Sequence, residues 1–591
     1  MAAGLGLPIA RRRHLSWPLM ALALAMAGAA CRTRKPADVP PAPASASQRL
    51  PVVVTLVVDQ LSAWAFEERF HRLPPAGGFH RLAREGTRID TLRYAHAVTD
   101  TAPGHASLYT GAVPREHGIY GNELVDDRGT VGAIIADPAT RLVCPGATEG
   151  TQSASAARLR VPTIADQFRE AHEDALIVSL SLKDRGALLP AGKRPTAAVW
   201  LDVKEFRFVT STAVASSLPA FVERHGSRDA LARGLAVWTH DGKARGDLPD
   251  DQPGEGDESG LGRTFPHDPR KATSPGRAFR TTPASDRTLF ALALDALDAE
   301  RAASRPTLLA LSLSAHDYVG HVFGPDSWEA WEELFALDAA LAEFFRALDA
   351  RFSEAGWAAV LSGDHGTMSM PEVVARRSGS CAGAAPRDRY ERPCGVTHRI
   401  DPDALTARLR ASLETALPGK GALLRGVGDP YVFVSPEVST LGPPDRERFD
   451  QTVRRTLLST GGVRAVFAVD ALPKACPPQD GDDALDEEAR IAALVCRSVL
   501  PNSGEHAGAY YVIPTRGSFF DPRIVRGFGT SHGSPYLYDR TVPMLVRAPG
   551  RAAAGLVVRE PVDFRAFAMT ASRLLGVSPP AAAKGGRDFA R

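Results

Sequence analysis

The stretch V-V-V-T-L-V-V-D at residues 52–59 decides the fold. It is a short apolar run, rich in β-branched residues, and it ends abruptly in the carboxylate of Asp59. Two later runs have the same form, L-L-A-L-S-L-S-A-H-D at 308–317 and W-A-A-V-L-S-G-D-H at 357–365. Apolar runs of this length and composition are typical of buried β-strands. We therefore predict an α/β fold in which these three strands belong to one parallel sheet.

Carboxylate and imidazole side chains follow the ends of these strands. In a parallel α/β sheet, ligands bind outside the carboxyl ends of the strands, so we expect these side chains to converge at one edge. Oxygen and neutral imidazole nitrogen suit zinc or a neighbouring divalent metal, and six such groups can hold two ions with three ligands each. The six candidates are Asp59, Asp317, His321, Asp364, His365 and His532.

Five motifs carry a resemblance to a known family. In order, they are D-T-A-P-G-H-A-S-L-Y-T-G-A-V-P-R-E-H-G-I-Y-G-N (100–122), S-L-K-D-R-G (181–186), D-Y-V-G-H (317–321), G-D-H-G (363–366) and S-H-G-S (531–534). Together they resemble the alkaline phosphatase superfamily, most closely its bacterial phosphate-irrepressible periplasmic phosphatases with a threonine nucleophile, which are related to nucleotide pyrophosphatase/phosphodiesterases. The resemblance implies a three-layer α/β/α sandwich with a central, mostly parallel sheet and an inserted cap or accessory subdomain.

The resemblance also implies a role for each candidate residue. Two Zn²⁺ ions are expected. One would be held by Asp317, His321 and His532. The other would be held by Asp59, Asp364 and His365, with the hydroxyl of Thr101 as a further ligand. The catalytic residues would be the nucleophile Thr101 and the phosphoryl-binding groups Asn122, Lys183 and Arg185.

The chemistry of a threonine nucleophile agrees with these implied roles. A threonine hydroxyl is a poor nucleophile at neutral pH, but metal coordination favours its ionised form, as it lowers the pKa of bound water from about 15.7 to about 7. Thr101 would attack phosphorus in line and become phosphothreonine, while the other zinc takes the charge on the leaving oxygen. A helix N-terminus at this position would also favour phosphate.

Lys183 and Arg185 are two residues apart, so on a strand both side chains would leave the same face and Asp184 would point away. Two cations and an amide suit a dianionic phosphoryl group, which favours phosphate monoesters. The alternative is a phosphodiesterase or nucleotide pyrophosphatase with the same metals and nucleophile, a branch in which this pair is typically missing. An isolated K-D-R is usually a solvated loop.

Structural interpretations of single motifs remain open alongside these roles. Asp59 could cap a helix, D-x-x-x-H at 317–321 could be an i,i+4 pair on a helix surface, and G-D-H-G could be a turn. Asp100 could repel a dianion if it faces inward. A third hypothesis is a catalytically silent surface lipoprotein. A sulfatase is disfavoured because the sequence has neither C-x-P-x-R nor S-x-P-x-R.

The N-terminus has the features of an export signal. Three arginines precede an apolar stretch that ends in small residues before Cys31, so residues 1–31 are predicted to be a signal peptide. Lipidation of Cys31 is left open because Gly28 stands where leucine is usual. The Pro/Ala/Ser-rich residues 32–50 are predicted to be a tether. We expect an exported protein of the periplasm or cell envelope, with possible membrane attachment through a lipidated cysteine.

Cysteine spacing is consistent with an oxidising compartment. The spacings 381 to 394 and 476 to 496 are compatible with local disulfides, and Cys144 is left over.

The charge balance and the length of the chain bear on its binding partners and its division into domains. The chain has 591 residues, with 70 basic and 68 acidic side chains and a formal net charge of +2. Such a balance does not favour nucleic-acid binding, so small-molecule phosphate esters are the expected partners, with the oligomeric state left open. We predict a first part of the catalytic core at 51–371 with a flexible surface insertion at about 242–285, a cap at 372–507, and a second part of the core at 508–591.

Overall fold

The computed structural model describes residues 52–590 except 126–129, 149, 243–248, 378–387, 501–507 and 522–523. The predicted signal peptide (1–31), the tether (32–50) and Cys381 lie outside the described residues. None of the helices in the described ranges combines the length and the apolar character of a membrane span.

A twelve-stranded sheet forms the centre of the fold. Its five middle strands are parallel to one another and fully or almost fully buried. In spatial order they are β11 (Trp357–Ser362), β1 (Val52–Val58), β10 (Thr307–Leu313), β7 (Leu176–Ser181) and β8 (Ala197–Asp202). The prediction that the three apolar runs form strands of one parallel sheet is therefore confirmed, and the structure shows that they are neighbours.

Antiparallel and short strands extend the sheet on both sides of this parallel centre. The strand β18 runs antiparallel to both β11 and β2, and β9 runs antiparallel to β8. The added strands are β2 (Thr87–Arg93), β5 (Ala136–Val143), β6 (Gln152–Ala154), β9 (Arg207–Ser211), β18 (Thr541–Arg547), β19 (Leu556–Val558) and β20 (Val562–Asp563).

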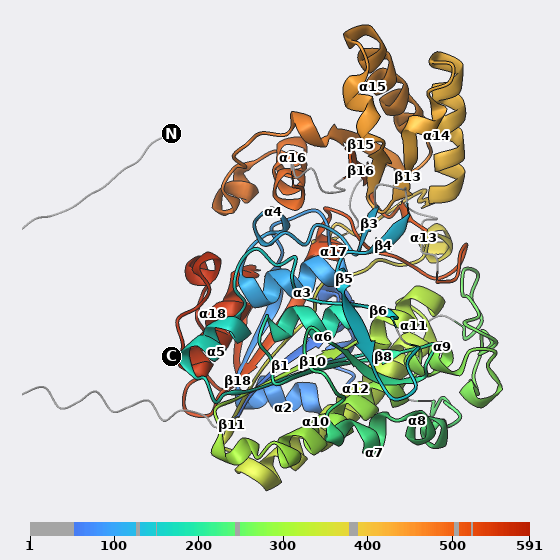
Figure 1. Cartoon of the computed structure of the whole chain (residues 1–591). Coiled ribbons are helices and arrows are strands. Elements are labelled where there is room, and N and C mark those ends of the chain that lie inside the picture. Colours follow the sequence, from blue (N-terminus) through green and yellow to red (C-terminus); the bar gives the residue numbers. More distant parts are fainter. Residues whose placement is uncertain are drawn as a thin grey trace, which may run out of the picture. The chain divides into compact units, whose positions relative to one another are not determined.

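Helices cover both faces of the sheet (Figure 1). Successive side chains of β1 alternate between two cores, so that Val54 and Leu56 pack on one face and Val53 and Val57 on the other. The first face is covered by α2 (Gly78–Glu85), α10 (Pro283–Ala299) and α12 (Trp328–Phe352). The opposite face is covered by α3 (Thr101–Thr110), α5 (Ile164–Ala171), α6 (Asp184–Ala191) and α18 (Arg565–Leu575). This is the predicted three-layer α/β/α sandwich.

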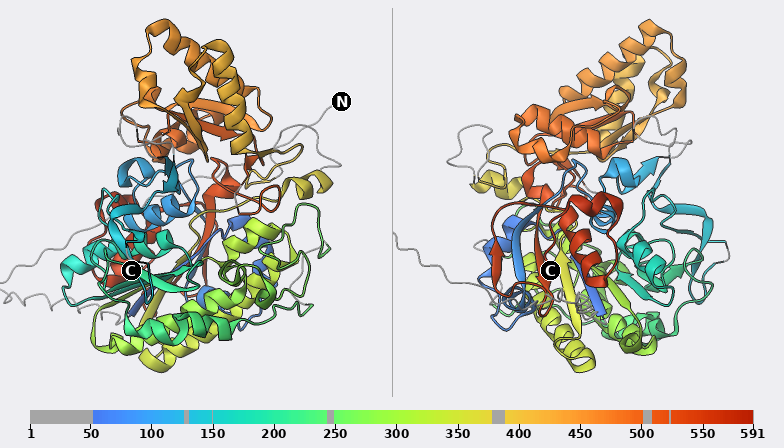
Figure 2. Two further views of the ribbon diagram at one scale, coloured as in Figure 1. Left: turned by 45° about the vertical axis from the view of Figure 1, so that its right-hand side comes forward. Right: turned by 90° about the vertical axis from the view of Figure 1, so that its left-hand side faces the viewer.

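A second, four-stranded sheet forms the centre of an accessory subdomain. Its strand order is β13, β14, β16, β15, and α14 and α15 pack on it. The bounds are β13 (Leu424–Gly428), β14 (Tyr431–Val434), β15 (Val463–Ala468), β16 (Tyr510–Pro514), α14 (Pro402–Ala416) and α15 (Pro443–Leu458). Both views of Figure 2 show these orange elements next to the blue segment that follows α3.

The strand at 508–514 corrects the predicted domain boundary. We expected it to return the chain to the catalytic core, but it is β16 and pairs with β14 and β15 in the accessory sheet. An apolar strand pattern shows that a segment is buried in a sheet and does not specify which sheet, so the boundary required the tertiary structure.

The described part of the 242–285 insertion differs from the predicted surface segment. Gln252, Glu255 and His267 are fully buried, and the backbone N–H of Gly256 donates to the carbonyl of Val322 at 2.8 Å. Polar groups of this segment therefore pack against the protein at these positions, while other residues such as Asp251 and Asp257 are exposed as expected of a surface segment. The segment contains α9 (Pro275–Arg280) and ends in the first turn of α10.

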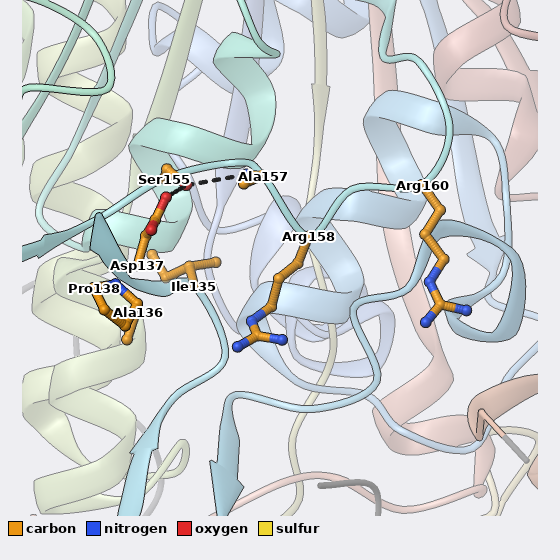
Figure 3. Close-up of a pocket in the computed structure, with 8 residues that line it drawn as sticks. All are labelled: Ile135, Ala136, Asp137, Pro138, Ser155, Ala157, Arg158 and Arg160. Atoms are coloured by element: carbon orange, nitrogen blue, oxygen red, sulfur yellow. Dashed lines mark hydrogen bonds between the residues drawn. The ribbon is translucent and has the colours of Figure 1, made fainter. Parts of the chain in front are cut away.

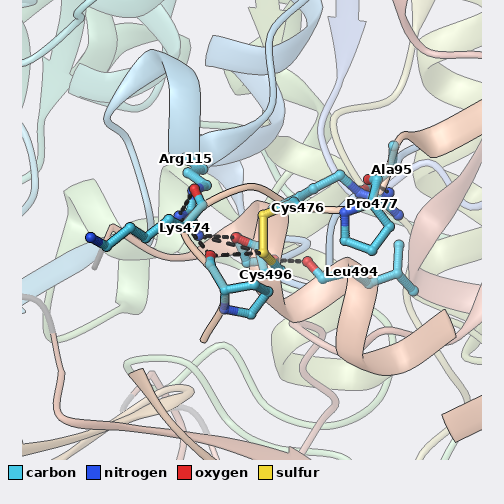
Figure 4. The surroundings of a disulfide bond; sticks show 10 residues. Ala95, Arg115, Lys474, Cys476, Pro477, Leu494 and Cys496 are labelled. Carbon is cyan, nitrogen blue, oxygen red and sulfur yellow. Dashed lines mark hydrogen bonds between the residues drawn. A yellow bond between two sulfur atoms is a disulfide. The ribbon is translucent and has the colours of Figure 1, made fainter. Parts of the chain in front are cut away.

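Of the two expected disulfides, Cys476–Cys496 lies within the described residues, and Cys394 of the other pair is also disulfide-bonded. Cys476 and Cys496 are joined with their Cα atoms 5.7 Å apart (Figure 4), which ties the loop after β15 to α16 (Glu487–Ser498). Arg115 holds this junction to the core, because its guanidinium donates to the carbonyl oxygens of Cys496 at 3.1 Å and Lys474 at 2.7 Å. Cys144, which we left over, is the free cysteine among the described residues.

Candidate active site

Three candidate metal ligands stand at the carboxyl ends of adjacent parallel strands. Asp59 directly follows β1, and Asp364 lies two residues beyond β11. Asp317 lies in the first turn of α11 (Ala315–Phe323), the helix that follows β10. Val58 of β1 is paired in register with the last residue of β10, so the two strands end level with each other. The strand pattern thus places all three carboxylates at one edge of the sheet, as predicted.

The first ligand group is Asp317, His321 and His532, the trio expected at one metal. One potential ligand atom from each lies within 4.8 Å of the others, and all three side chains are buried. His321 Nε2 is 3.2 Å from Asp317 Oδ1 and 3.3 Å from His532 Nε2. One turn of α11 separates the first two residues, so the i,i+4 spacing that could have been a surface pair points into the site instead.

The second ligand group is Asp59, Asp317 and His365. The sequence analysis expected Asp364 in the place of Asp317 here, so Asp317 belongs to both groups in the structure. Asp364 remains close, with its Oδ2 3.7 Å from His365 Nε2. Its other oxygen accepts hydrogen bonds from the backbone N–H groups of Gln60 and His365, at 3.1 and 3.0 Å.

The three imidazole rings are oriented by backbone carbonyl groups. The Nδ1 atom of His321 donates to the carbonyl of Thr530, that of His532 to Thr99, and that of His365 to Gly366, at 2.8 to 3.0 Å. A carbonyl oxygen only accepts, so each Nδ1 carries the proton and each Nε2 faces the carboxylates, the orientation that backbone partners give to metal-binding histidines. Burial and the neighbouring His365 lower the pKa of His532, which favours the neutral ring that binds metal.

These residues fit a pair of divalent metals. Asp364 Oδ2 and His365 Nε2 are buried without a hydrogen-bond partner among the described residues. Leaving buried polar atoms unpaired is costly, and a cation at this edge of the sheet would satisfy them. Mixed carboxylate and imidazole donors suit zinc and its neighbours.

Lys183 contacts a carboxylate of each ligand group and links them to Thr101. Thr101 is the first residue of α3 and is 1% exposed. The Nζ atom of Lys183 donates to Thr101 Oγ1 at 3.1 Å and to Asp317 Oδ2 at 2.5 Å, and it lies 2.7 Å from Asp59 Oδ2. Burial alone would lower the pKa of this ammonium, but the carboxylates of Asp317 and Asp59 raise it above its ordinary value. Lys183 is therefore charged beside the threonine hydroxyl.

Lys183 and Arg185 do not lie on a strand, so the shared strand face considered for them does not form. β7 ends at Ser181, Lys183 is the N-cap residue of α6, and Arg185 lies in the first turn of that helix. Helix α6 begins at Asp184, between the two cations, so Lys183 and Arg185 do not share a strand face. The Arg185 side chain is 24% exposed and its Nε has no hydrogen-bond partner among the described residues.

Asn122 contacts the helix that carries Thr101. Its Oδ1 accepts a hydrogen bond from the backbone N–H of Ala102 at 2.9 Å. This contact places the amide beside the N-terminus of α3, where the helix dipole favours an anion.

Asp100 lies against one of the candidate ligand rings. Its Oδ1 lies 3.1 Å from Nδ1 of His532, and the side chain is 4% exposed. Burial is the largest influence and opposes ionisation of this carboxyl, but the hydrogen bond to His532 and the charges of His532, His365 and Arg185 together lower the pKa of Asp100. Asp100 therefore acts on a ligand ring, a role that sequence analysis missed.

Other polar residues near the motifs support the candidate ligands. His105 Nδ1 is 3.1 Å from Asp364 Oδ2, and His316 Nδ1 is 2.6 Å from a carboxylate oxygen of Glu333. Gln60, which the sequence analysis also missed, donates from Nε2 to Asp317 Oδ1 at 3.0 Å. The backbone of Gln60 has a φ of 67°, which is a left-handed conformation. Its position after a strand-end aspartate did not predict this conformation.

A pocket elsewhere on the chain is separate from this cluster. It has a volume of about 340 Å³, lies beside β5 and β6, and contains Arg158 and Arg160 at its wall (Figure 3). None of the candidate catalytic or metal-binding residues lines it.

Comparisons with known proteins agree with the geometry. The family model of type I phosphodiesterase / nucleotide pyrophosphatase matches residues 53–382. Alkaline phosphatase PafA of Elizabethkingia meningoseptica is 33% identical over 340 residues, 54% of this chain and 61% of the relative. Alkaline phosphatase PhoV of Synechococcus elongatus is 30% identical over 333 residues, 54% of this chain and 60% of the relative. The alignments thus span about three fifths of the length of these two relatives.

Solved structures show the same fold. The crystal structure of wild-type alkaline phosphatase PafA superposes with a TM-score of 0.75 at 25% identity, covering 92% of this chain and 98% of that chain. A quadruple mutant of PafA gives a TM-score of 0.77 at 24% identity, with the same coverage of both chains. With a family model that matches more than half of its length, the chain belongs to the type I phosphodiesterase/nucleotide pyrophosphatase family of the alkaline phosphatase superfamily.

Proposed function

We propose that the protein is a two-metal phosphoric ester hydrolase that cleaves phosphate monoesters through a phosphothreonine on Thr101. The observation that carries this proposal is the position of the Thr101 hydroxyl. It lies 3.1 Å from an ammonium, Lys183, that contacts Asp59 and Asp317, the carboxylates of the two candidate ligand groups. The names of the relatives, all phosphatases or phosphodiesterases in the comparisons above, support the same reaction class.

The proposed metals are two Zn²⁺ ions. Asp317, His321 and His532 would hold one ion, and Asp59, His365 and Asp364 the other, with Asp317 also within reach of the second group. When bound, two such cations supply Lewis-acid chemistry, which favours ionised hydroxyl groups and offsets the negative charge that develops on oxygens around phosphorus.

The residues of the chain would carry out two displacements. Oγ1 of Thr101 loses its proton to solvent and bonds to phosphorus, while the ester P–O bond breaks and the leaving alcohol takes up a proton. Water then attacks the phosphothreonine phosphorus, and Thr101 regains a proton as inorganic phosphate leaves. Lys183 and Arg185 would offset the charge of the phosphoryl oxygens, and the N-terminus of α3 would orient them.

Monoester cleavage is supported by Lys183, which contacts Thr101, and by Arg185, which lies two residues further along the chain. A monoester presents a dianionic phosphoryl group, and Lys183 and Arg185 together match that charge. The second candidate is a diesterase or nucleotide pyrophosphatase with the same metals and nucleophile. The observation in its favour is the family model itself, which is named for those activities.

The deciding experiment is kcat/KM of the zinc-loaded protein on matched aryl phosphate monoesters, diesters and sulfate esters, with Thr101→Ala as the blank. We expect strong monoester preference. Diester preference would select the second candidate. Absence of turnover on all three esters, with both metals bound, would contradict the hydrolase proposal and favour a binding role.

We also propose that the protein is exported to the periplasm or cell envelope. The basic and apolar residues before Cys31 support this, as does the Cys476–Cys496 disulfide, since disulfides persist in oxidising compartments. Fractionation of a bacterial host that expresses the full chain tests export. Loss of membrane association in Cys31→Ala would identify a lipid anchor, and a soluble periplasmic product from both chains would identify a cleaved signal.

A further inference from the structure

Tyr318 places an aromatic ring against the ammonium of Lys183. It follows Asp317 in α11, and its side chain is buried. The Nζ atom of Lys183 lies over the ring of Tyr318, 5.0 Å from the ring centroid, and the Lys183 side chain is also buried. The π face of a tyrosine attracts a cation at this distance, and the attraction is stronger where water is excluded. The ring therefore helps to fix the position of the ammonium.

The contact with Tyr318 differs in kind from the other contacts of Lys183. The ammonium lies 2.5 Å from Asp317 Oδ2 and 2.7 Å from Asp59 Oδ2, and it donates to Thr101 Oγ1 at 3.1 Å. Both carboxylates are candidate metal ligands, so metals bound there would draw on the same oxygens as the ammonium. The face of an aromatic ring does not ligate such metals. Tyr318 thus offers Lys183 a contact for which the metals do not compete.

Arg280, from the inserted segment, packs on the same ring. It is the last residue of α9, and its Cζ atom lies over the ring of Tyr318, 4.1 Å from the centroid. Its Nε is buried without a hydrogen-bond partner among the described residues, and its Nη2 is 3.9 Å from Oε2 of the buried Glu258. The carboxylate of Glu258 offsets the charge of the guanidinium, so two cations can share one ring. Contacts therefore run from α9 through Tyr318 to Lys183.

We propose that Tyr318 is a positioning residue for Lys183: its ring, packed against Arg280, holds the ammonium beside the hydroxyl of Thr101 while the two carboxylates hold metal. This inference rests on the proposed function and adds a residue to the same site. It also gives α9 a part in the reaction, because Arg280 belongs to that helix.

The test compares two replacements of the ring in the zinc-loaded full chain. Tyr318→Leu removes the π face and is expected to lower kcat/KM for an aryl phosphate monoester by about tenfold, equivalent to about 1.4 kcal/mol. It should weaken the binding of inorganic phosphate, measured by calorimetry, by a similar factor. Tyr318→Phe keeps the π face and should bring both quantities back to within about twofold of the wild type. Equal losses in the two variants would overturn the role of the ring.

Two arginine variants test the contact from α9. Arg280→Met keeps an extended apolar side chain without the guanidinium and is expected to lower the same kcat/KM by about threefold. Arg277→Met is the matched control, because Arg277 lies in the same helix and 3.8 Å from a carboxylate oxygen of Glu258. Arg277 makes no cation–π contact in the described part of the chain. Equal losses in the two variants would show that the contact of Arg280 with the ring has no effect of its own.

A double-mutant comparison separates positioning from a structural effect. If Tyr318 acts through Lys183, Tyr318→Leu should lower kcat/KM and phosphate affinity by less than about twofold in a Lys183→Ala background. A full tenfold loss in that background would overturn the inference. Because Tyr318 follows Asp317, the zinc content of each variant is measured by elemental analysis and should equal that of the wild type. Loss of zinc in Tyr318→Leu would assign the residue to the metal site instead.

The outcomes also distinguish this inference from the proposed function. If the wild type cleaves monoesters and Tyr318→Leu does so equally well, the role of Tyr318 is overturned while the hydrolase proposal stands. If the wild type prefers diesters, the same variants measured on a diester test the contact, since Lys183 borders Thr101 with either substrate. If no ester is cleaved, the proposed function is wrong and the inference falls with it.

Discussion

The ammonium of Lys183 donates a hydrogen bond to the hydroxyl of Thr101 across 3.1 Å, although the two residues are 82 positions apart in the chain. The contact joins the N-cap of α6 to the first residue of α3. A positive charge next to a hydroxyl favours its ionised form, so this pair would help to activate the nucleophile.

Thr101→Ala is expected to reduce kcat for phosphate monoesters by about 10³-fold or more, because the atom that bonds to phosphorus is removed. Thr101→Ser retains a hydroxyl and should keep measurable turnover. Acid quench during turnover should trap a phosphorylated protein in the wild type and none in Thr101→Ala. Equal turnover of the alanine and serine variants would show that water attacks phosphorus directly.

The double variant Lys183→Ala/Arg185→Ala is expected to lose more monoester than diester cleavage, by about 10²-fold in the ratio of the two kcat/KM values. The physical reason is that a monoester carries one more negative charge on its phosphoryl oxygens, and each lost cation contributes a few kcal/mol. Lys193→Ala, at an exposed lysine shortly after α6, is the matched control. Equal losses of monoester and diester cleavage would show that Lys183 and Arg185 do not recognise phosphoryl charge and have a structural role instead.

Asp317→Asn is expected to remove more metal than Asp364→Asn, because Asp317 belongs to both ligand groups in the structure. The wild type should bind two equivalents of zinc by elemental analysis, and a chelator should abolish activity and lower the melting temperature. A ligand at 100 times its Kd stabilises the folded state by about 2.7 kcal/mol, so the thermal shift on zinc addition should be largest in the wild type. Equal metal contents in the two variants would contradict the role of Asp317 as a ligand to both metals.

Asp338→Asn is expected to stabilise the protein at alkaline pH. Asp338 is fully buried in α12, accepts a hydrogen bond from the backbone N–H of Phe79 at 2.8 Å, and leaves Oδ2 unpaired among the described residues. Burial, partly offset by backbone hydrogen bonds, raises the pKa of Asp338 from 3.8 to about 6.

The sign of the pH effect follows from that shift. A raised folded pKa means that the stability from the protonated Asp338 is fully present below about pH 4 and is lost as the pH rises through about 6, by about 3 kcal/mol at most. The asparagine variant lacks this loss. Urea unfolding at pH 8 and pH 4.5 should therefore show a larger advantage of Asp338→Asn at pH 8, and the same difference at both pH values would contradict the shift.

Much of the catalytic centre was accessible from the sequence, because its elements are local. The apolar run before Asp59 must be buried, and a strand buried on both faces of a parallel sheet places the residue after it at the carboxyl edge. The same reasoning applies to the runs before Asp317 and Asp364. His321 follows from Asp317 by one helical turn, so both fall on one side of α11.

The resemblance to the alkaline phosphatase superfamily supplied what local pattern could not. The spacing of apolar residues does not identify the four candidate catalytic residues, which were found only through the order of the motifs. They are Thr101, Asn122, Lys183 and Arg185. Their placement was still incomplete, since the strand geometry considered for Lys183 and Arg185 does not apply at the junction of β7 and α6, where they lie.

The tertiary structure alone decided the contacts between segments that are distant in the chain. It placed Asp317 in both ligand groups, paired Asp100 with His532, and brought Gln60 to two carboxylates. These contacts depend on side-chain direction and on the turn geometry after each strand, which hydrophobic pattern does not encode. The positions of the strands along the chain could be predicted from sequence, because a run of apolar residues is a local pattern. The choice of partners, including the sheet that β16 joins, was determined by packing across the whole fold.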